Sequence, residues 1–350
     1  MGEPGIGDYQ FAVTGYAGFE SEILRLRNAN RSLAQTAEYL EWRYAGSNGA
    51  PEAKVYWIND RAGRSTGMAA LIFRPFWVNA KLQHVAVLGD ISLDSELRGR
   101  GLGRSLLKFM AEDLDRDHAD CLAFVIPNEA AQQSLTSVGW TTGGRLIPHV
   151  FLLNPEEKLR RVLGSSWLAR GIAGPAARLM AGVARLRRKE GCSLHVAGGP
   201  DDSFDSLWQR LAKQYLVLSD RSLQALHWRY VDHPGCTFEF ARLDRHGQPA
   251  GYLVYQVSQA SRECFIYDLI LLEQGDLGCM LALFITQLAD QGGVDIVRLL
   301  LNDGHPYGRQ LWKLGFVARD PSGVFQLYGR SARNGLGGSR WFLTLGDKDI

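Results

Sequence analysis

The alternation of apolar and polar positions in the first half of the chain predicts strands separated by amphipathic helices. Apolar runs at 85–93 and 121–126 predict two strands. Between them, apolar residues recur at helical spacing from Leu106 to Leu114, which predicts a helix. A short helix follows Asn128, and a further apolar run at 147–153 predicts a final strand. This order of elements predicts an α/β fold with a mixed sheet.

A segment rich in glycine and arginine joins the first of these strands to the helix. Its residues are Arg98, Gly99, Arg100, Gly101, Leu102, Gly103, Arg104 and Ser105. Glycines let the backbone approach a ligand closely and turn N–H groups outward. The positive end of the helix dipole and three arginines add positive charge. The segment therefore predicts a cradle for an anion, most simply a pyrophosphate.

Other phosphate-binding loops fit this segment less well. A Walker loop requires Gly-Lys-Ser/Thr, and no lysine follows the glycines here. A dinucleotide-binding loop requires G-x-G-x-x-G, which is a different spacing. The spacing Arg98-x-x-Gly101-x-Gly103 instead resembles the R/Q-x-x-G-x-G/A loop of the GNAT acyltransferase superfamily. On this loop alone, a glycine turn before a solvated basic helix start is the alternative interpretation.

The residues downstream strengthen the resemblance. Asn128 follows the strand predicted at 121–126, a short helix comes next, and Gly139-Trp140 closes it. This order is similar to the later GNAT motif, in which an Asn ends a strand and a Gly-Phe pair follows the helix. The loop, strand, Asn and Gly-aromatic pair occur in the expected order, so we identify a GNAT-like unit.

The second half of the chain repeats the first. The sequence LEWRY at 40–44 recurs as LHWRY at 226–230, and two hairpin-turn signatures recur in the same order. The matching pairs are Phe19 and Phe204, Trp42 and Trp228, Asp60 and Asp244, Gly63 and Gly247, and Gly139 and Gly315. We predict two tandem GNAT-like units, each a mostly antiparallel central sheet with flanking helices. The Trp-Arg-Tyr motifs either contact substrate or are architectural, and their presence in both copies favours the second interpretation.

The two copies differ at the anion loop. The second central strand, predicted at 265–272, is followed by a loop with two acids, no arginine and a different glycine spacing. Negative charge repels a pyrophosphate, so only the first unit is expected to bind the cofactor. The predicted organisation is a GNAT-like domain with an intact acyl-CoA loop over 1–155, a basic amphipathic linker over 156–191, and a second GNAT-like domain with a degenerate loop over 192–350.

The linker predicts a possible membrane contact. Residues 158–189 hold nine Lys or Arg residues and no acid, interleaved with Leu and Trp. One interpretation is a helix lying on an anionic membrane surface. The other is a pair of linker helices on the protein body, with their charges in water.

Composition limits the classes of function. A chain of 350 residues with 46% hydrophobic residues is long enough for two globular domains. A net charge of +2 argues against a dedicated nucleic-acid binder. The polar N-terminus and the lack of a long apolar stretch predict a cytoplasmic protein. Five cysteines without a C-x-x-C pair and eight histidines without metal spacing predict neither disulfides nor a metal site.

The resemblance implies where a cofactor binds. In this superfamily an acyl-CoA lies in a V between the central strand and the next strand. Its pantetheine would pair with backbone groups of Ile91 and Leu93, and its pyrophosphate would take N–H groups from residues 99–104. Asn128 would hydrogen-bond the cofactor or an ordered water. The implied cofactor is acetyl-CoA or another acyl-CoA.

Two residues are candidates for the general base. Asp90 lies on the central strand within an apolar run, where burial could raise its pKa toward neutrality. The alternative is that Asp90 pairs with a nearby arginine. His84, at the start of the same strand, is the weaker candidate. The tyrosine that often protonates the leaving thiolate in this family is replaced by Leu135. Either Ser134 or a water supplies the proton, or CoA leaves as the thiolate, or the acid comes from elsewhere.

These features predict an N-acyltransferase that moves an acyl group, most simply acetyl, from acyl-CoA to a primary amine. The acceptor would be a small or sugar-like molecule. One alternative is a non-catalytic acyl-CoA-binding module, which the missing tyrosine favours. Another is a tandem transferase of the peptidoglycan-bridge type that uses aminoacyl-tRNA, although its copies normally lack an intact CoA loop.

Overall fold

The structure is a computed structural model that describes residues 6–31, 33–46, 49–118, 120–154, 190–329 and 341–348. The first unit contains β1 (Gln10–Gly15), α1 (Glu20–Asn28), α2 (Ala37–Tyr44), β2 (Lys54–Asn59), β3 (Ser65–Val78), β4 (Lys81–Leu93), α3 (Leu102–Asp117), β5 (Ala123–Val125), α4 (Glu129–Ser137) and β6 (Thr141–Leu152). The strands predicted in this half correspond to β4, β5 and β6, and the predicted helices to α3 and α4. The linker at 158–189 lies outside the described residues.

The second unit follows a similar order of elements, with the short strands β8, β13 and β15 in addition. It contains β7 (Cys192–Ala197), α7 (Ser203–Leu211), β8 (Val217–Ser219), α8 (Leu223–Leu226), β9 (Glu239–Arg245), β10 (Gln248–Ser258), β11 (Glu263–Leu271), α9 (Leu277–Gln291), β12 (Ile296–Asn302), α10 (Gly308–Leu311), β13 (Val317–Ala318), β14 (Gly323–Tyr328) and β15 (Trp341–Phe342). Short turns of 3-10 helix include Gln274–Asp276 before α9 and Leu345–Asp347 after β15. The predicted second central strand is β11.

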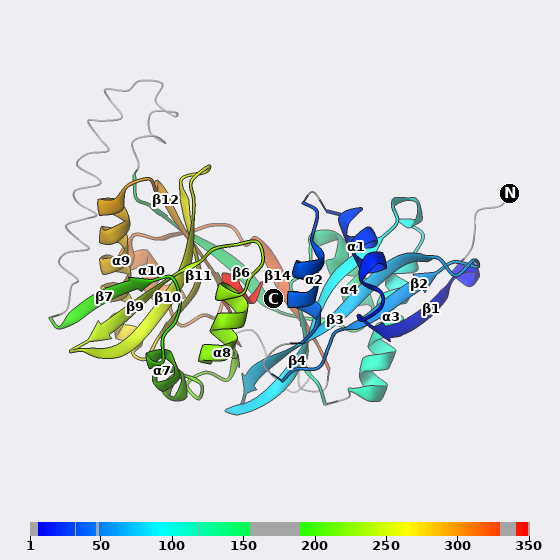
Figure 1. Ribbon diagram of the computed structural model, residues 1–350, viewed down its shortest axis with the longest axis horizontal. Helices are drawn as coiled ribbons and strands as arrows, with labels where there is room; N and C mark the ends of the chain where they lie inside the picture. The colour runs from blue at the N-terminus through cyan, green and yellow to red at the C-terminus, as the bar shows by residue number, and fades with distance from the viewer. Residues whose placement is uncertain are drawn as a thin grey trace, which may run out of the picture.

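One mixed sheet runs through both units in the order β1-β2-β3-β4-β5-β14-β6-β12-β11-β10-β9-β7. Along this path β4 with β5 and β11 with β12 are parallel, and the other pairs are antiparallel. The prediction of a mostly antiparallel mixed sheet in each unit is confirmed. Figure 1 shows the two units side by side, with β6 and β14 between them.

The last strands of the two units are exchanged. β14, from the second unit, pairs with β5 of the first, and β6, from the first unit, pairs with β12 of the second. β14 and β6 also pair with each other. The domain boundaries at residues 155 and 192 remain a prediction. In space, each unit contributes one strand to the part of the sheet that belongs to the other unit.

In the first unit both faces of the sheet are buried, which explains the long apolar runs of the central strands there. Along β3, Met68, Ala70 and Ile72 share a core with α1 and α2. The intervening residues Ala69 and Leu71 share a core with α3. This period of two places α1 and α2 on one face and α3 on the other. Among the described helices, none is long and apolar enough to cross a membrane.

The repeated Trp-Arg-Tyr motifs meet at the interface between the units. The rings of Trp42 and Trp228 stack with their centroids 5.0 Å apart. Each indole N–H donates to the backbone carbonyl of the other tryptophan, at 2.7 and 3.1 Å. Arg74 adds a cation over the Trp228 ring, 4.4 Å from its centroid. The reciprocal contact supports the architectural interpretation for the two tryptophans.

Candidate active site

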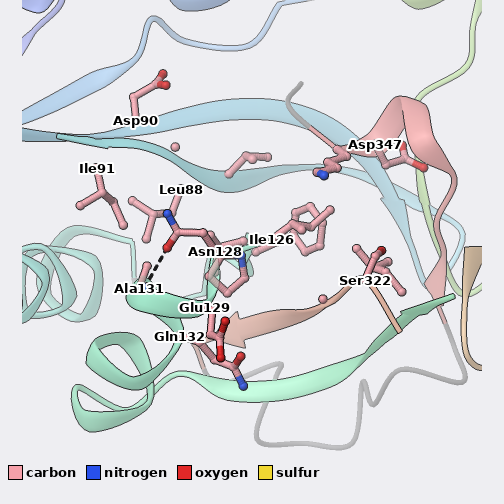
Figure 2. A pocket seen from close by; sticks show the side chains of 18 of the residues that line it. Leu88, Asp90, Ile91, Ile126, Asn128, Glu129, Ala131, Gln132, Ser322 and Asp347 are labelled. Carbon is pink, nitrogen blue, oxygen red and sulfur yellow. Dashed lines mark hydrogen bonds between the residues drawn. The ribbon is translucent and has the colours of Figure 1, made fainter. Parts of the chain in front are cut away.

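Two parallel strands of the first unit diverge and leave a cleft. β4 and β5 are paired only at Ala86–Ala123 and Val87–Phe124. β4 then continues to Leu93, whereas β5 ends at Val125. A cavity of about 770 Å³ lies between them, a size suited to a small-molecule site. Its walls come from β4, from Phe124 and the residues that follow it, from the start of α4, from the loop after α1, from α2, from β6 and from two segments of the second unit. Figure 2 shows this cavity from close by.

A β-bulge changes the direction of the peptide groups along β4. Met68 lies opposite Ser92 and Ala70 lies opposite Gly89, so two residues of β4 face one residue of β3. Asp90 stands in the bulge with a φ of +55°, in the left-handed region that Asp tolerates better than most residues. The bulge places Asp90 on the opposite side of β4 from Leu88 and Ile91 (Figure 2).

Beyond the bulge, the free edge of β4 faces the cleft. The N–H of Asp94 donates to the carbonyl of Thr66 at 2.8 Å, so the peptide groups of Asp94 point toward β3. Because these directions alternate along a strand, Leu93 turns its peptide groups the other way, away from β3. Leu93 is one of the two residues for which the resemblance implied pairing with pantetheine. The other, Ile91, stands in the bulge and lines the cavity.

The glycine-rich loop lies where β4 ends and α3 begins. Gly99 and Gly101 have φ values of +79° and +81°, which glycine adopts without strain. Gly101 is the N-cap of α3 and offers no side chain to the helix. The first N–H groups of a helix have no partner within it, and the first turn of α3 holds no acid. This end of α3 is therefore suited to an anion.

Asp90 is the centre of a buried ionic network. Its side chain is inaccessible to solvent and lies 3.1 Å from Arg27, 2.7 Å from Arg31 and 3.3 Å from Arg43. The hydroxyl of Tyr44 donates to Oδ2 at 2.6 Å. These partners come from α1, α2 and the loop between them, so Asp90 fixes both helices to the central strand.

The expectation that burial raises the pKa of Asp90 toward neutrality is wrong. Burial does raise it, but the attraction of Arg43, Arg27 and Arg31 and the hydrogen bond from Tyr44 outweigh burial. Together they lower the pKa of Asp90 to about 2. A carboxylate with this pKa is a very weak base at neutral pH. The alternative interpretation, pairing with arginine, describes the observed contacts.

The second unit holds an aspartate at the equivalent position. Leu93 lies opposite Gly67 in the first unit, and Leu271 lies opposite Gly251 in the second unit. Asp90 and Asp268 each stand three residues before these leucines. Asp268 is also buried, and its Oδ2 lies 2.8 Å from the guanidinium of Arg221. An arginine-paired aspartate in both units supports an architectural role for this position.

The other predicted residues fall in different places. Asn128 lines the cavity, and its side chain accepts from the N–H of Ala131 at 2.9 Å as the N-cap of α4. His84 is exposed at the other end of β4 and does not line the cavity. Neither Leu135 nor Ser134 lines the cavity, and the side chain of Leu135 is fully buried.

The equivalent cleft of the second unit is filled by its own chain. The N–H of Leu271, equivalent to Leu93, donates to the hydroxyl of Tyr307 at 2.9 Å. Phe342, from the C-terminal segment, is 1% exposed and packs against Tyr307. The loop is also shorter, with five residues between β11 and α9 against eight between β4 and α3. A buried acid, Asp276, stands at its end as the N-cap of α9.

The sequence suggests that the second unit either shapes the acceptor site or stabilises the assembly, but it does not indicate which of its residues line the cavity. Ser322, Asp347 and Lys348 line the first unit's cavity, although they lie more than two hundred residues from β4. Figure 2 shows Ser322 and Asp347 on the side of the cavity away from Ile91. No local motif marks these residues. Only the recognition that β14 is exchanged into the first sheet could have found Ser322.

The mixed sheet, the divergence of β4 and β5 and the glycine-rich loop define the class of the first unit as an acyltransferase fold. Residues 21–140 match the model of the "Acetyltransferase (GNAT) family". The chain therefore carries a GNAT-family domain over these residues. A search of curated proteins finds no significant match.

Solved structures extend the likeness to more than nine-tenths of the chain. A GCN5-related N-acetyltransferase from Anabaena variabilis has a TM-score of 0.63 at 14% identity, covering 91% of this chain and 72% of its own. The N-myristoyltransferase of Saccharomyces cerevisiae with bound myristoyl-CoA has a TM-score of 0.57 at 11% identity, covering 93% and 83%. A tandem GNAT protein from the clavulanic acid biosynthesis pathway has a TM-score of 0.55 at 15% identity, covering 91% and 98%. At these identities the likeness shows the fold, which is that of a tandem GNAT protein.

Proposed function

We propose that this protein is an N-acyltransferase that transfers an acyl group, most simply acetyl, from acyl-CoA to the primary amine of a small or sugar-like acceptor. The observation that carries the proposal is the open cleft between β4 and β5, together with the glycine- and arginine-rich loop that joins the end of β4 to the start of α3. The equivalent cleft of the second unit is closed by Tyr307 and Phe342, so the proposed stoichiometry is one cofactor for each chain.

The residues of the cleft fit an acyl-CoA. Ile91 lines the cleft and Leu93 turns its peptide groups away from β3, while the first turn of α3 offers N–H groups to a pyrophosphate. A Cβ at Gly99 would meet nothing within 4 Å, so this part of the loop is open on its outer side. Acyl-CoA supplies an activated thioester carbonyl. The chain's contribution is to bind and orient the cofactor and the amine, which is the main source of acceleration in such a reaction.

The proposed roles of the catalytic candidates follow from their surroundings. We assign Asp90 to positioning, because it holds Arg31 and Arg43 at the cavity wall and has a pKa of about 2. His84 lies outside the cavity and takes no part in the proposal. In this arrangement the acceptor ammonium gives one proton to water, and the neutral amine attacks the thioester carbonyl to form the C–N bond. The C–S bond then breaks, CoA leaves as the thiolate, and the nitrogen loses its second proton through water to that thiolate.

The test is acetyl-CoA binding by calorimetry, with wild type compared with Gly103→Glu and Gly103→Gln. The nearest atoms to a Cβ at Gly103 are those of Leu93, at 3.7 Å, so a side chain fits there without a clash. Glutamate in the first turn also favours the helix. We expect Gly103→Glu to weaken binding about 100-fold, since its charge would lie beside the pyrophosphate. Gly103→Gln, of equal size and no charge, should lose less than about 10-fold.

The outcomes separate the candidate functions. If wild type fails to bind acetyl-CoA and longer acyl-CoAs, the acyltransferase proposal and the acyl-CoA-binding module are both wrong. Binding without release of the CoA thiol across a panel of amines would favour the non-catalytic module. The missing tyrosine at Leu135 is the observation in favour of that second candidate.

A further inference from the structure

The part of the cavity wall beside Asp90 carries more positive charge than its acid neutralises. Arg27, Arg31 and Arg43 all pair with the single carboxylate of Asp90. Arg27 and Arg31 share its Oδ1, while Arg43 and the hydroxyl of Tyr44 share its Oδ2. Among these four side chains, three guanidinium groups share one carboxylate, so positive charge exceeds negative charge. Surplus charge is unfavourable in a protein interior unless an anion compensates it.

The donors of this cluster also exceed its acceptors. Arg27 is completely buried, and in the described part of the chain its Nε and Nη1 have no hydrogen-bond partner. Arg31 and Arg43 line the cavity, so they can reach a ligand there. The side chain of Arg31 is 40% exposed, and one of its amino groups donates to Asp90 at 2.7 Å. The remaining edge of its guanidinium is suited to paired hydrogen bonds with an oxyanion.

The second unit contributes a further cation, Lys348, to the wall of the same cavity. Lys348 is exposed and has no ion pair within the described residues. Its neighbour Asp347 is already held by Arg221 at 3.0 Å and Arg229 at 3.5 Å, so it does not neutralise Lys348. Glu129, at the start of α4, is the one other acid of the cavity wall in the described part of the chain. The charged side chains of the cavity wall that are available to a ligand are therefore mainly positive.

We propose that the acceptor of this enzyme carries an anionic oxygen group, a carboxylate or a phosphate, in addition to its amine. Arg31 binds this group, and Lys348 adds a second positive charge from the second unit. The inference rests on the proposed function, because it names the substrate class of the same site. The cofactor's pyrophosphate has its own cradle at the start of α3, which leaves the Arg31 region to the acceptor.

Three matched amines test the proposal: ethanolamine, β-alanine and O-phosphoethanolamine. They share an aminoethyl group and carry a hydroxyl, a carboxylate and a phosphate respectively. The deciding measurement is calorimetric binding of each amine to protein saturated with CoA, which does not depend on turnover. For wild type we expect at least one anionic amine to bind about 10-fold more tightly than ethanolamine. The tighter of the two anionic amines identifies the group that is recognised.

Variants locate the binding group. Arg31→Gln should remove most of the preference for the anionic amine, and Lys348→Gln part of it, while the affinity for acetyl-CoA stays within about 3-fold. Arg298→Gln is the matched control, since Arg298 is 38% exposed, pairs with Glu263 at 2.6 Å and lies away from the cavity. It should change neither affinity.

Two results would overturn the inference. One is equal binding of all three amines, or of none, by wild type. The other is a loss of acetyl-CoA affinity in Arg31→Gln as large as its loss of amine affinity, which would assign Arg31 to the cofactor. If acetyl-CoA does not bind but the anionic amines bind through Arg31, the acyltransferase proposal fails and the anion site stands.

Discussion

Replacing Asp90 with asparagine lowers the free energy of unfolding by about 3–5 kcal/mol, because it leaves the buried guanidinium groups of Arg27 and Arg43 without their counter-charge. Asparagine has nearly the same size and tolerates the φ of +55° at this position, so the change removes charge with little added backbone strain. Urea denaturation followed by circular dichroism measures the loss.

Asp94→Asn is the matched control for this variant. Asp94 lies four residues further along the chain, and its carboxylate pairs with Arg25 at 3.5 Å and with Arg64 at 3.4 Å. Both arginines are at least a third exposed, so the loss should stay below about 1 kcal/mol. If Asp90→Asn retains wild-type stability and acetyl-CoA binding but abolishes acyl transfer, Asp90 is the general base and the positioning role is wrong.

The pH dependence provides a second readout of the same network. The pKa of Asp90 is lowered to about 2 in the folded chain, below its ordinary value of 3.8. A lowered pKa means that the folded state favours the charged form, so this contribution to stability is complete above about pH 4 and is lost as pH falls toward 2. The difference in stability between wild type and Asp90→Asn should therefore narrow from pH 4 downward, and remain constant between pH 5 and 7.

The features that the sequence could predict are those marked by residues close together in the chain. The glycine-rich loop, its preceding strand and its following helix lie within about thirty residues, and each signal depends on neighbours in the chain. The repeat was also predictable, because Trp42 and Trp228 stand in equivalent positions of two similar segments. That the loop of the second unit does not bind a pyrophosphate could be predicted from its two acids and its glycine spacing.

The surroundings of Asp90 could not be predicted, because its partners are distant in the sequence. Arg31 and Arg43 lie 59 and 47 residues before it. Burial alone has the effect that sequence analysis expected, but the number of arginines that reach the carboxylate decides the sign of the pKa shift. The same pattern of an apolar strand with one aspartate is compatible with a base or with an ionic network.

The exchange of β6 and β14 was hidden for a different reason. The two units share a fold, so a last strand can complete either sheet with the same alternation of apolar residues. Tertiary packing alone decides between the two pairings. The consequence for the site is large, since β14 and the segment after it bring Ser322 and Lys348 to the first unit's cavity.

Replacing Phe342 with alanine should also lower the free energy of unfolding by about 3–5 kcal/mol, the usual cost of removing a buried phenylalanine. Phe342 is 1% exposed, and its ring centroid lies 4.3 Å from those of both Tyr215 and His305. Trp312→Ala is the control, because Trp312 is 69% exposed in the same unit and should cost no more than about 0.5 kcal/mol.

The Phe342→Ala variant also tests why the second unit is expected to bind no cofactor. Removal of the ring opens part of the cleft between β11 and β12, but it leaves the short loop and the buried Asp276 at the start of α9 unchanged. An acid at that position opposes a pyrophosphate whether or not the cleft is filled. Calorimetry with acetyl-CoA should therefore still give one site per chain. A second equivalent bound by Phe342→Ala would mean that the filled cleft, and not the loop, excludes the cofactor from the second unit.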